Sequence, residues 1–150
     1  GVYTVDEQVL EAVQADGGIY PMPTEYLQKL RAFCDRHEIL LIVDDIQAGC
    51  GRSGNFFAFE KSGITPDLVT LSKSIGGMGM PMALLLMKPE LDIWQPGEHT
   101  GTFRGNQLSL VAAKAGLEVF VNEKVAQQVA EKEAIVAKYM KEEIEPLHYT

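Results

Sequence analysis

The chain has few cysteines and no cluster of metal-binding residues. Cys34 and Cys50 are the only cysteines among 150 residues, too few for a disulfide framework and not spaced as zinc ligands. Cys34 lies on the apolar side of a predicted helix, so we expect a buried, reduced thiol there. The sequence therefore predicts neither a structural disulfide nor a metal site.

Positive charge and long apolar runs are scarce as well. The 13 Lys and Arg residues are outnumbered by 21 Asp and Glu residues, which gives a net charge of −8 and leaves no basic stripe for a nucleic acid. No apolar run reaches the ~18 to 20 residues that cross a bilayer, and no signal peptide is visible. We therefore expect no nucleic-acid partner, no membrane partner and a cytoplasmic location.

Short apolar runs that alternate with helical patterns are what the chain does contain. Predicted strands cover 9–13, 40–43, 68–71 and 83–87, and predicted helices begin at 24, 56, 106 and 122. Thr24 is the expected N-cap of the first helix. The alternation indicates an α/β fold, with a mostly parallel sheet flanked by helices. The apolar strands and the almost wholly apolar helix from 106 imply burial of the sheet on both faces and of this helix.

Polar residues follow two of these strands. Asp44 and Asp45 follow the run at 40–43, and Lys73 follows the run at 68–71. Parallel sheets place their ligand sites at the carboxyl ends of strands. Pyridoxal phosphate (PLP) needs a lysine that holds its aldehyde as a Schiff base and an acid that keeps its ring nitrogen protonated. This pair of residues therefore points to PLP.

Plainer interpretations of the same residues stay open. Lys73 is an ordinary solvated lysine if taken alone, and Asp44 is a cap for the following turn. Neighbouring side chains on a strand point to opposite faces, so one of Asp44 and Asp45 faces the ligand and the other is structural. The donor-rich turn 101–106, which runs into a helix, is either a phosphate site or a helix start without a ligand.

Taken together, the motifs resemble the class III aminotransferases of the type I PLP fold. The resemblance covers essentially all 150 residues, and its segments come in family order at 11–18, 41–54, 66–73 and 101–106. The fold it implies is the large domain of a PLP-dependent transferase. Residues 1–121 would form the C-terminal part of that PLP-binding domain, and 122–150 a helix connecting to a small C-terminal domain. Because the chain begins with Gly1 and ends just after a helix, we expect a piece of a longer protein.

The resemblance also assigns roles to individual residues. It implies that Lys73 binds PLP covalently and shuttles the proton, that Asp44 holds the ring-nitrogen proton, and that Gln47 contacts the 3′-oxygen. It implies that Thr102 reaches the phosphate bound by a neighbouring subunit, so that a homodimer or larger homo-oligomer shares its active sites. Asp16 would be a substrate-gating residue, although many relatives carry a longer Glu there.

Within the family, the stretches 43–52 and 91–106 are most similar to the diaminobutyrate aminotransferases, above all the ectoine-type branch. The implied reaction moves the γ-amino group between L-2,4-diaminobutyrate and 2-oxoglutarate, with glutamate and aspartate β-semialdehyde as the other pair. The siderophore and diaminopropane branches, or an enzyme of the ornithine or GABA type, are the alternatives within the family. Asp45 departs from the Glu that the wider class carries.

Two interpretations outside this one remain. The chain could be an inactive piece of an aminotransferase, because the upstream phosphate-binding residues and the downstream carboxylate-binding arginine of the family lie outside its 150 residues. A receiver domain also has acids and a lysine after its strands. It needs a phosphoacceptor aspartate at the end of the intervening strand, however, whereas Asp67 precedes its strand.

Overall fold

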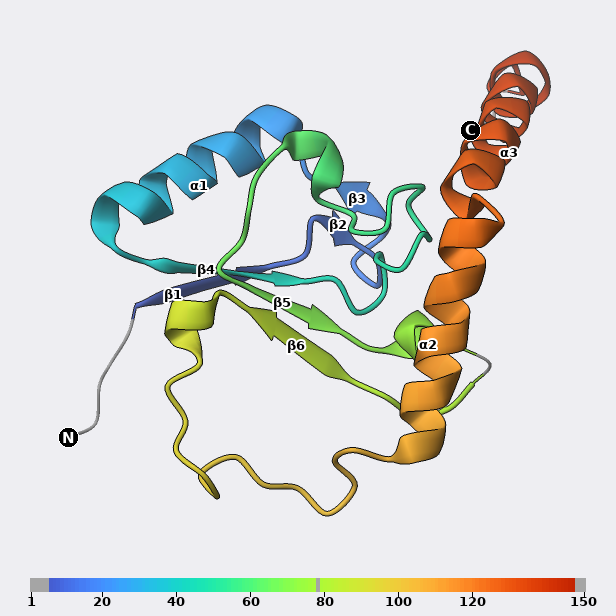
Figure 1. The fold of residues 1–150 in the computed structure, drawn as a ribbon. Coiled ribbons are helices and arrows are strands. Elements are labelled where there is room, and N and C mark those ends of the chain that lie inside the picture. The colour runs from blue at the N-terminus through green and yellow to red at the C-terminus, as the bar shows by residue number, and fades with distance from the viewer. Residues whose placement is uncertain (1–5, 78, 148–150) are drawn as a thin grey trace.

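A four-stranded sheet forms the centre of the computed structural model, which describes residues 6–77 and 79–147 (Figure 1). Its order is β1 (Glu7–Leu10), β4 (Leu40–Asp44), β5 (Leu68–Leu71) and β6 (Leu84–Met87). The first three strands run parallel, and β6 is an antiparallel edge strand. The prediction of an α/β fold with a mostly parallel sheet is confirmed. The predicted strand 9–13 is divided between β1 and a separate hairpin of β2 (Val13–Gln14) and β3 (Tyr20–Pro21).

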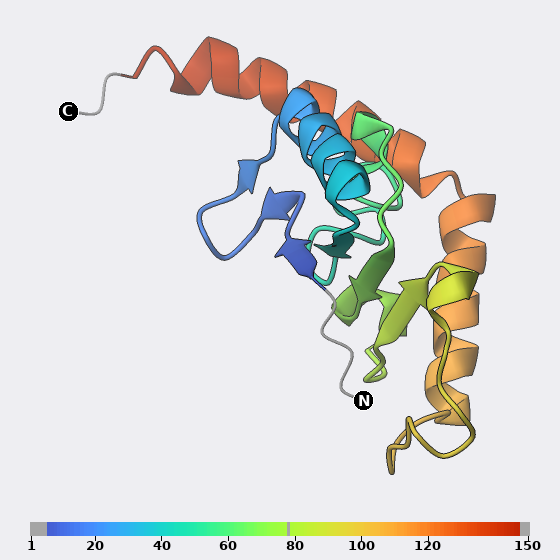
Figure 2. The ribbon, with the colours of Figure 1, turned by 90° about the vertical axis from the view of Figure 1, so that its left-hand side faces the viewer.

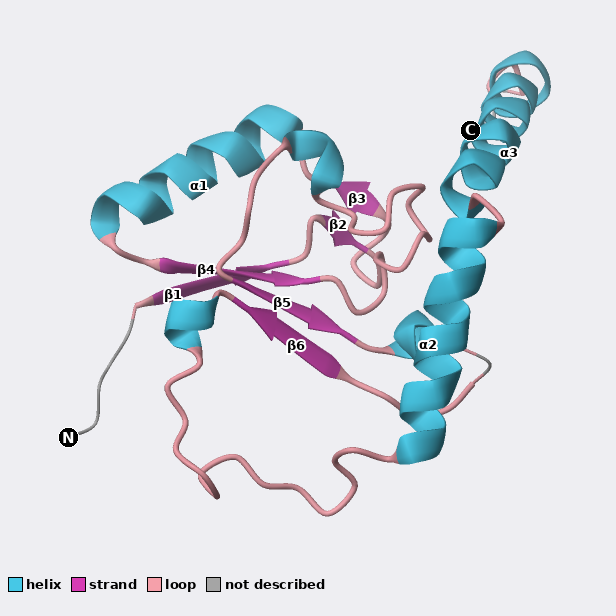
Figure 3. Ribbon diagram, in the orientation of Figure 1, coloured by secondary structure: helices cyan, strands magenta, loops and turns pink. Residues whose placement is uncertain are grey.

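Helix α1 (Thr24–His37) lies across one face of the sheet (Figures 1 and 3). It buries Leu27 and Cys34 against Leu41 and Val43 of the central strand β4. Each fully buried aliphatic side chain of this kind contributes about 1.5 to 3 kcal/mol. The expected N-cap at Thr24 is wrong: Pro23 occupies that position without a side-chain hydrogen bond, and its ring fixes φ at −58° just before the first helical residue.

Two short 3-10 helices lie between strands, η1 (Glu60–Ser62) and η2 (Lys73–Gly76), and a third, η3 (Pro89–Leu91), follows β6. The short helix expected at 56–61 is thus shorter and begins at Glu60. The long apolar stretch forms α2 (Gln107–Asn122), which lies beside the carboxyl ends of β4 and β5 in Figure 1.

The helix expected to begin at 122 begins three residues later, after a break in the helical backbone. Glu123 and Lys124 separate α2 from α3 (Val125–Tyr139), and Lys124 takes a left-handed φ of 51°. A single π-helical stretch, η4 (Met140–Ile144), continues α3. Figure 2 shows this helix extending away from the sheet. None of the helices in the described ranges is long and apolar enough to cross a membrane.

The sheet and helix α2 are each buried on one face only. The expectations that the sheet is covered on both faces and that this helix is buried all round are therefore wrong for the described chain. Only Ser109 and Ala113 of α2 are buried, whereas Leu108 is 70% exposed, because one side of this helix alone contacts the rest of the described chain. The sheet is likewise packed on the α1 side, while Val9 stays 52% exposed. The apolar patterns predicted the central strands β4 and β5 and the helix α2, but much of the surface that they predict to be covered is open here.

Candidate active site at the carboxyl ends of β4 and β5

Lys73 and Gln47 meet where the two central parallel strands end. β4 ends at Asp44, which pairs in register with Thr70 of β5, and Lys73 follows β5 after a single intervening residue. The Lys73 Nζ donates a hydrogen bond to Gln47 Oε1. The sequence predicted both residues at this edge, and the parallel register brings them together although they lie 26 positions apart.

The backbone at Lys73 has an uncommon conformation. Its φ is 49°, in the left-handed region that residues other than glycine rarely adopt. The preceding residue anchors this segment, because Ser72 Oγ donates to the carbonyl of Met82 at 2.8 Å. Residues held in such conformations by their surroundings are concentrated at functional sites. The conformation therefore supports a special role for Lys73 and could not be predicted from the sequence.

The two adjacent acids have different environments, as the alternation of strand side chains predicts. Asp45 is completely buried and accepts hydrogen bonds from the N–H of Ala58, the shorter at 3.1 Å. A Cβ on Gly49 would lie 2.5 Å from Asp45 Oδ2, so this position admits only glycine next to the buried carboxylate. Asp45 thus ties the glycine-rich loop 49–58 to the end of β4.

Burial is the main cause of an unusual pKa at Asp45. The pKa of this carboxyl is raised from 3.8 to about 6: loss of water raises it most, the hydrogen bond from Ala58 lowers it, and the charges of Asp44 and Glu60 raise it. Asp45 is therefore the structural member of the pair.

Asp44 is half-buried, whereas its neighbour Asp45 is completely buried. The Asp44 Oδ1 accepts the N–H of Ile46 at 3.0 Å, which confirms that Asp44 caps the following turn. Among the described residues, no hydrogen bond to its Oδ2 is observed, and the buried Thr70 Oγ1 on the neighbouring strand also lacks a partner. Register partners in a parallel sheet share a face, so the side chains of Asp44 and Thr70 point to the same side of the sheet. A free carboxylate oxygen, an amine and a primary amide at one edge fit the polar groups of PLP.

Neither Thr102 nor Asp16 makes an observed hydrogen bond to Lys73, Asp44 or Gln47 within the described chain, although the turn that carries Asp16 follows the carboxyl end of β1, which runs parallel to β4. Both are exposed: Asp16 in the turn between β2 and β3, and Thr102 in the long segment before α2. The start of α2 is capped by its own sequence, because Asn106 Oδ1 accepts the N–H groups of Leu108 and Ser109 at 3.0 and 3.2 Å. These two amides are therefore not free for the phosphate that the turn 101–106 suggested.

A second charged cluster lies at the opposite end of β5 and was not predicted. Asp67 is 7% exposed and accepts hydrogen bonds from Arg31 Nη1 at 2.6 Å, Lys88 Nζ at 2.6 Å and the N–H of Leu41 at 2.8 Å. Burial raises the pKa of this carboxyl, but the three donors outweigh burial and the net pKa is lowered. The signal in the sequence was an acid placed directly before a buried strand.

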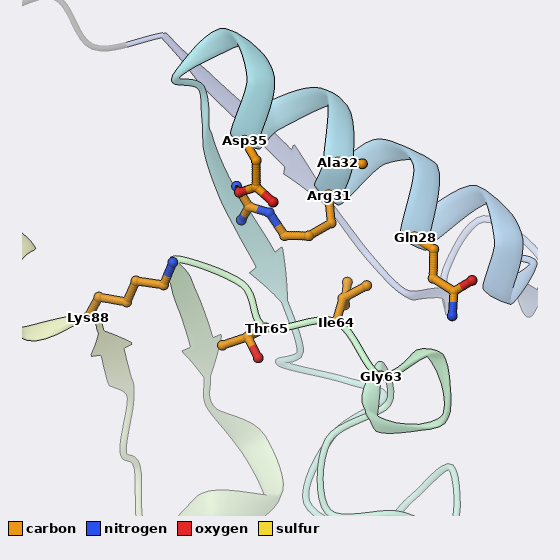
Figure 4. A pocket seen from close by; sticks show the side chains of 8 residues that line it. All are labelled: Gln28, Arg31, Ala32, Asp35, Gly63, Ile64, Thr65 and Lys88. Atoms are coloured by element: carbon orange, nitrogen blue, oxygen red, sulfur yellow. The ribbon is translucent and has the colours of Figure 1, made fainter.

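An open cavity of about 400 Å³ borders this second cluster, between α1 and the segment 63–65 (Figure 4). Figure 4 shows Arg31 and Asp35 on α1 and Lys88 beyond the end of β6. The charged groups around it are already paired with one another. Within the described ranges, no group of three or more His, Cys, Asp or Glu side chains is placed to hold a metal ion.

Comparison with known proteins agrees with this geometry. The family model for aminotransferase class-III matches residues 5–148. The chain is 61% identical over 112 residues to a diaminobutyrate–2-oxoglutarate transaminase of Vibrio parahaemolyticus, covering 75% of this chain and 27% of that protein. It is 52% identical over 136 residues to the protein of that name from Sporosarcina pasteurii, covering 91% and 32%.

The fold is similar to that of a solved ornithine aminotransferase from Toxoplasma gondii, whose active site holds PLP at partial occupancy. The TM-score is 0.85 at 31% identity, over 91% of this chain and 32% of that one. The chain belongs to the aminotransferase class-III family. It spans about 30% of the length of the curated relatives it matches. Family membership excludes the receiver-domain alternative, and Asp67 lies at the opposite end of β5 from Lys73.

Proposed function

We propose that the whole protein is a PLP-dependent aminotransferase that moves the γ-amino group between L-2,4-diaminobutyrate and 2-oxoglutarate, with glutamate and aspartate β-semialdehyde as the other pair. One observation carries the proposal: the Lys73 amine, just after β5, donates a hydrogen bond to the side-chain amide of Gln47. Gln47 follows three residues after Asp44, the last residue of the neighbouring strand β4. PLP, when bound, supplies an electron sink for the carbon that gains or loses the amine.

The residues of this chain have distinct tasks in that reaction. Lys73 would hold the cofactor covalently and carry the proton on its Nζ. Asp44 would hold a proton on the ring nitrogen through the carboxylate oxygen that the turn leaves free. Gln47 presents its Oε1 to Lys73, so its amide nitrogen is available to donate to the 3′-oxygen of the cofactor.

The identity of the amine rests on the relatives. Proteins at 52% and 61% identity that carry the name diaminobutyrate–2-oxoglutarate transaminase support that substrate pair, and we assign the protein to the ectoine-type branch on the residues at 43–52. The 31% identity to an ornithine aminotransferase keeps a second candidate, a longer diamine. Comparing kcat/KM for diaminobutyrate, ornithine and 4-aminobutyrate separates these possibilities.

The test of the chemistry is the replacement Lys73→Ala in the whole protein, with Lys61→Ala on the exposed helix η1 as the control. Lys73→Ala should abolish both transamination and the visible absorbance of lysine-bound PLP, while Lys61→Ala keeps both. Peptide mapping after borohydride reduction should find the cofactor on Lys73. If the whole protein shows no such absorbance, or if the label lies on another lysine, the proposal fails and an inactive aminotransferase relative is favoured.

We further propose that 1–121 belong to the PLP-binding domain and 122–150 to a connecting helix; of these ranges, 1–5, 78 and 148–150 lie outside the described residues. The exposed Thr102 is proposed to contact the phosphate held by a neighbouring subunit in a homodimer. Mixing Lys73→Ala and Thr102→Ala proteins tests this, because only an intersubunit contact regenerates one intact site in a mixed dimer. No recovery of cofactor affinity after mixing would contradict it.

Asp16 is proposed as a substrate-gating residue on the exposed turn between β2 and β3. A gate that distinguishes two substrates changes one half-reaction more than the other. Asp16→Asn is therefore expected to alter the KM for glutamate and the KM for diaminobutyrate unequally. Equal changes in the two half-reactions would remove this role.

A further inference from the structure

The segment that carries Lys73 is fastened to helix α2 by contacts that the proposed chemistry does not use. Ser109 of α2 is 3% exposed, and its Oγ donates to the carbonyl of Pro81 at 2.9 Å. Ser72, directly before the lysine, donates to the carbonyl of Met82. The Ser72 hydrogen bond joins the two ends of the segment 72–82, and the Ser109 hydrogen bond attaches its later end to α2.

Between those hydrogen bonds, two glycines bring the backbones of η2 and α2 together. A Cβ on Gly77 would lie 2.4 Å from the carbonyl oxygen of Ala112, and Gly77 has a left-handed φ of 63°. A Cβ on Gly116 would lie 3.3 Å from the Cα of Gly77. Any side chain at Gly116 would therefore push the Gly77 backbone by a few tenths of an ångström.

A displacement at Gly77 reaches Lys73 because one short helical turn joins them. The N–H of Ile75 donates to Ser72 and the N–H of Gly77 donates to Ser74, so η2 moves as a unit. Lys73 is the first residue of this turn and already has a constrained backbone. Side-chain chemistry depends steeply on such placement, since a misplacement of about 1 Å can cost on the order of 10²-fold in rate.

We propose that α2 is a positioning element for the Lys73 amine, with Gly116 and Ser109 as its positioning residues. The inference rests on the proposed role of Lys73. Neither residue contacts Lys73 itself among the hydrogen bonds and close approaches observed in the described chain; they act through Gly77 and Pro81. The lack of a side chain at Gly116 allows the Gly77 backbone at the end of η2 to approach the helix closely.

The substitution Gly116→Ala in the PLP-loaded whole protein tests this, with Gly76→Ala as a matched control. Both add one methyl group, but a Cβ on Gly76 would meet Met82 at an ordinary 3.8 Å. Alanine favours a helix more than glycine does, but its Cβ crowds Gly77, so a purely structural role for Gly116 predicts a changed thermal midpoint with unchanged kcat and KM per folded molecule. The positioning role instead predicts a kcat lower by roughly tenfold at little-changed KM, because the shift is a few tenths of an ångström.

A second readout does not depend on turnover: the pH at which the visible absorbance of the loaded protein changes should shift in Gly116→Ala and not in Gly76→Ala. Ser109→Ala, which frees the Pro81 carbonyl without touching the glycine contact, should shift it in the same sense if α2 positions the lysine. The inference is overturned if Gly116→Ala matches Gly76→Ala in both kcat and this pH, or if its lost activity only follows lost folded protein. Failure of the proposed function would look different from failure of this inference, because the wild-type protein itself would then carry no cofactor on Lys73.

Discussion

Each end of the central sheet carries an aspartate, but the two carboxylates differ in how many hydrogen bonds they accept. At the amino end of β5, the Asp67 carboxylate accepts from Arg31, Lys88 and a backbone N–H, all within 2.8 Å. At the carboxyl end of β4, Asp44 accepts a single observed hydrogen bond from the turn it caps. A carboxylate whose acceptor sites are filled stabilises the fold, whereas one with a free oxygen can bind a ligand.

The comparison teaches that a buried acid is informative only together with its partners. Asp45 makes the same point within the candidate site, because it is more buried than Asp44 and its hydrogen-bonding partner is backbone. The residue with the largest perturbation of pKa there is thus the structural one. Perturbed pKa values alone would select Asp45 rather than Asp44, the carboxylate that we propose binds the cofactor.

The strongest test of this contrast is Asp44→Ala in the whole protein. Without the carboxylate the cofactor ring loses its proton and becomes a poor electron sink, so turnover should fall by orders of magnitude while the thermal midpoint changes little. Steady-state kinetics and calorimetry measure both quantities. Asp35→Ala, which removes an acid that is 63% exposed, is the control and should leave turnover unchanged. A turnover within tenfold of wild type would show that Asp44 is not the essential aspartate.

The opposite end should respond in the opposite way. Asp67→Ala leaves the partly buried Arg31 with one partner fewer and removes the acceptor for the N–H of Leu41, so we expect a loss of about 3 to 5 kcal/mol in the free energy of unfolding. The kcat per folded molecule should stay near wild type. Urea denaturation with active-site titration measures the two quantities. Asp35→Ala removes the exposed partner of the same arginine and should cost less than about 1 kcal/mol. Equal losses for the two variants would contradict the stabilising role of Asp67.

A smaller effect concerns pH. The pKa of Asp45 is raised to about 6 in the folded state, so the contribution of this group to stability is present below its usual pKa and is lost as the pH rises through 6. At about 1.4 kcal/mol per pKa unit, a rise from 3.8 to about 6 corresponds to about 3 kcal/mol at most. The free energy of unfolding of Asp45→Asn, relative to wild type, should therefore increase between pH 4 and pH 7.

Urea denaturation across that range provides the measurement for Asp45→Asn. The lowered pKa of Asp67 has the reverse sign: its contribution is present at neutral pH and is lost as the pH falls below the usual aspartate range. A difference between Asp45→Asn and wild type that stays flat from pH 4 to pH 7 would mean that the buried carboxyl has an ordinary pKa.

The local order of elements and the chemistry of the site could be predicted from the sequence, since both depend on short-range patterns. The apolar runs gave β4 and β5, and Lys73, Asp44 and Gln47 stand at the ends of those strands as expected. The Thr24 cap and the full burial of α2 failed for different reasons. The first failed because Pro23 already fixed the backbone there, and the second because apolar periodicity says which face needs cover without saying which segment supplies it.

By itself, the sequence determined which residues stand at strand ends and therefore which side chains are available for chemistry. Only the tertiary structure decided that Asp45 is fully buried while Asp44 is half-buried, and that Asp67 accepts hydrogen bonds from three donors. It also decided that the Gly77 backbone packs closely against the backbone of α2. The physical reason is range. Strand and helix periodicity are properties of neighbouring residues, whereas desolvation, hydrogen-bond saturation and backbone approach depend on segments that meet only after the chain has folded.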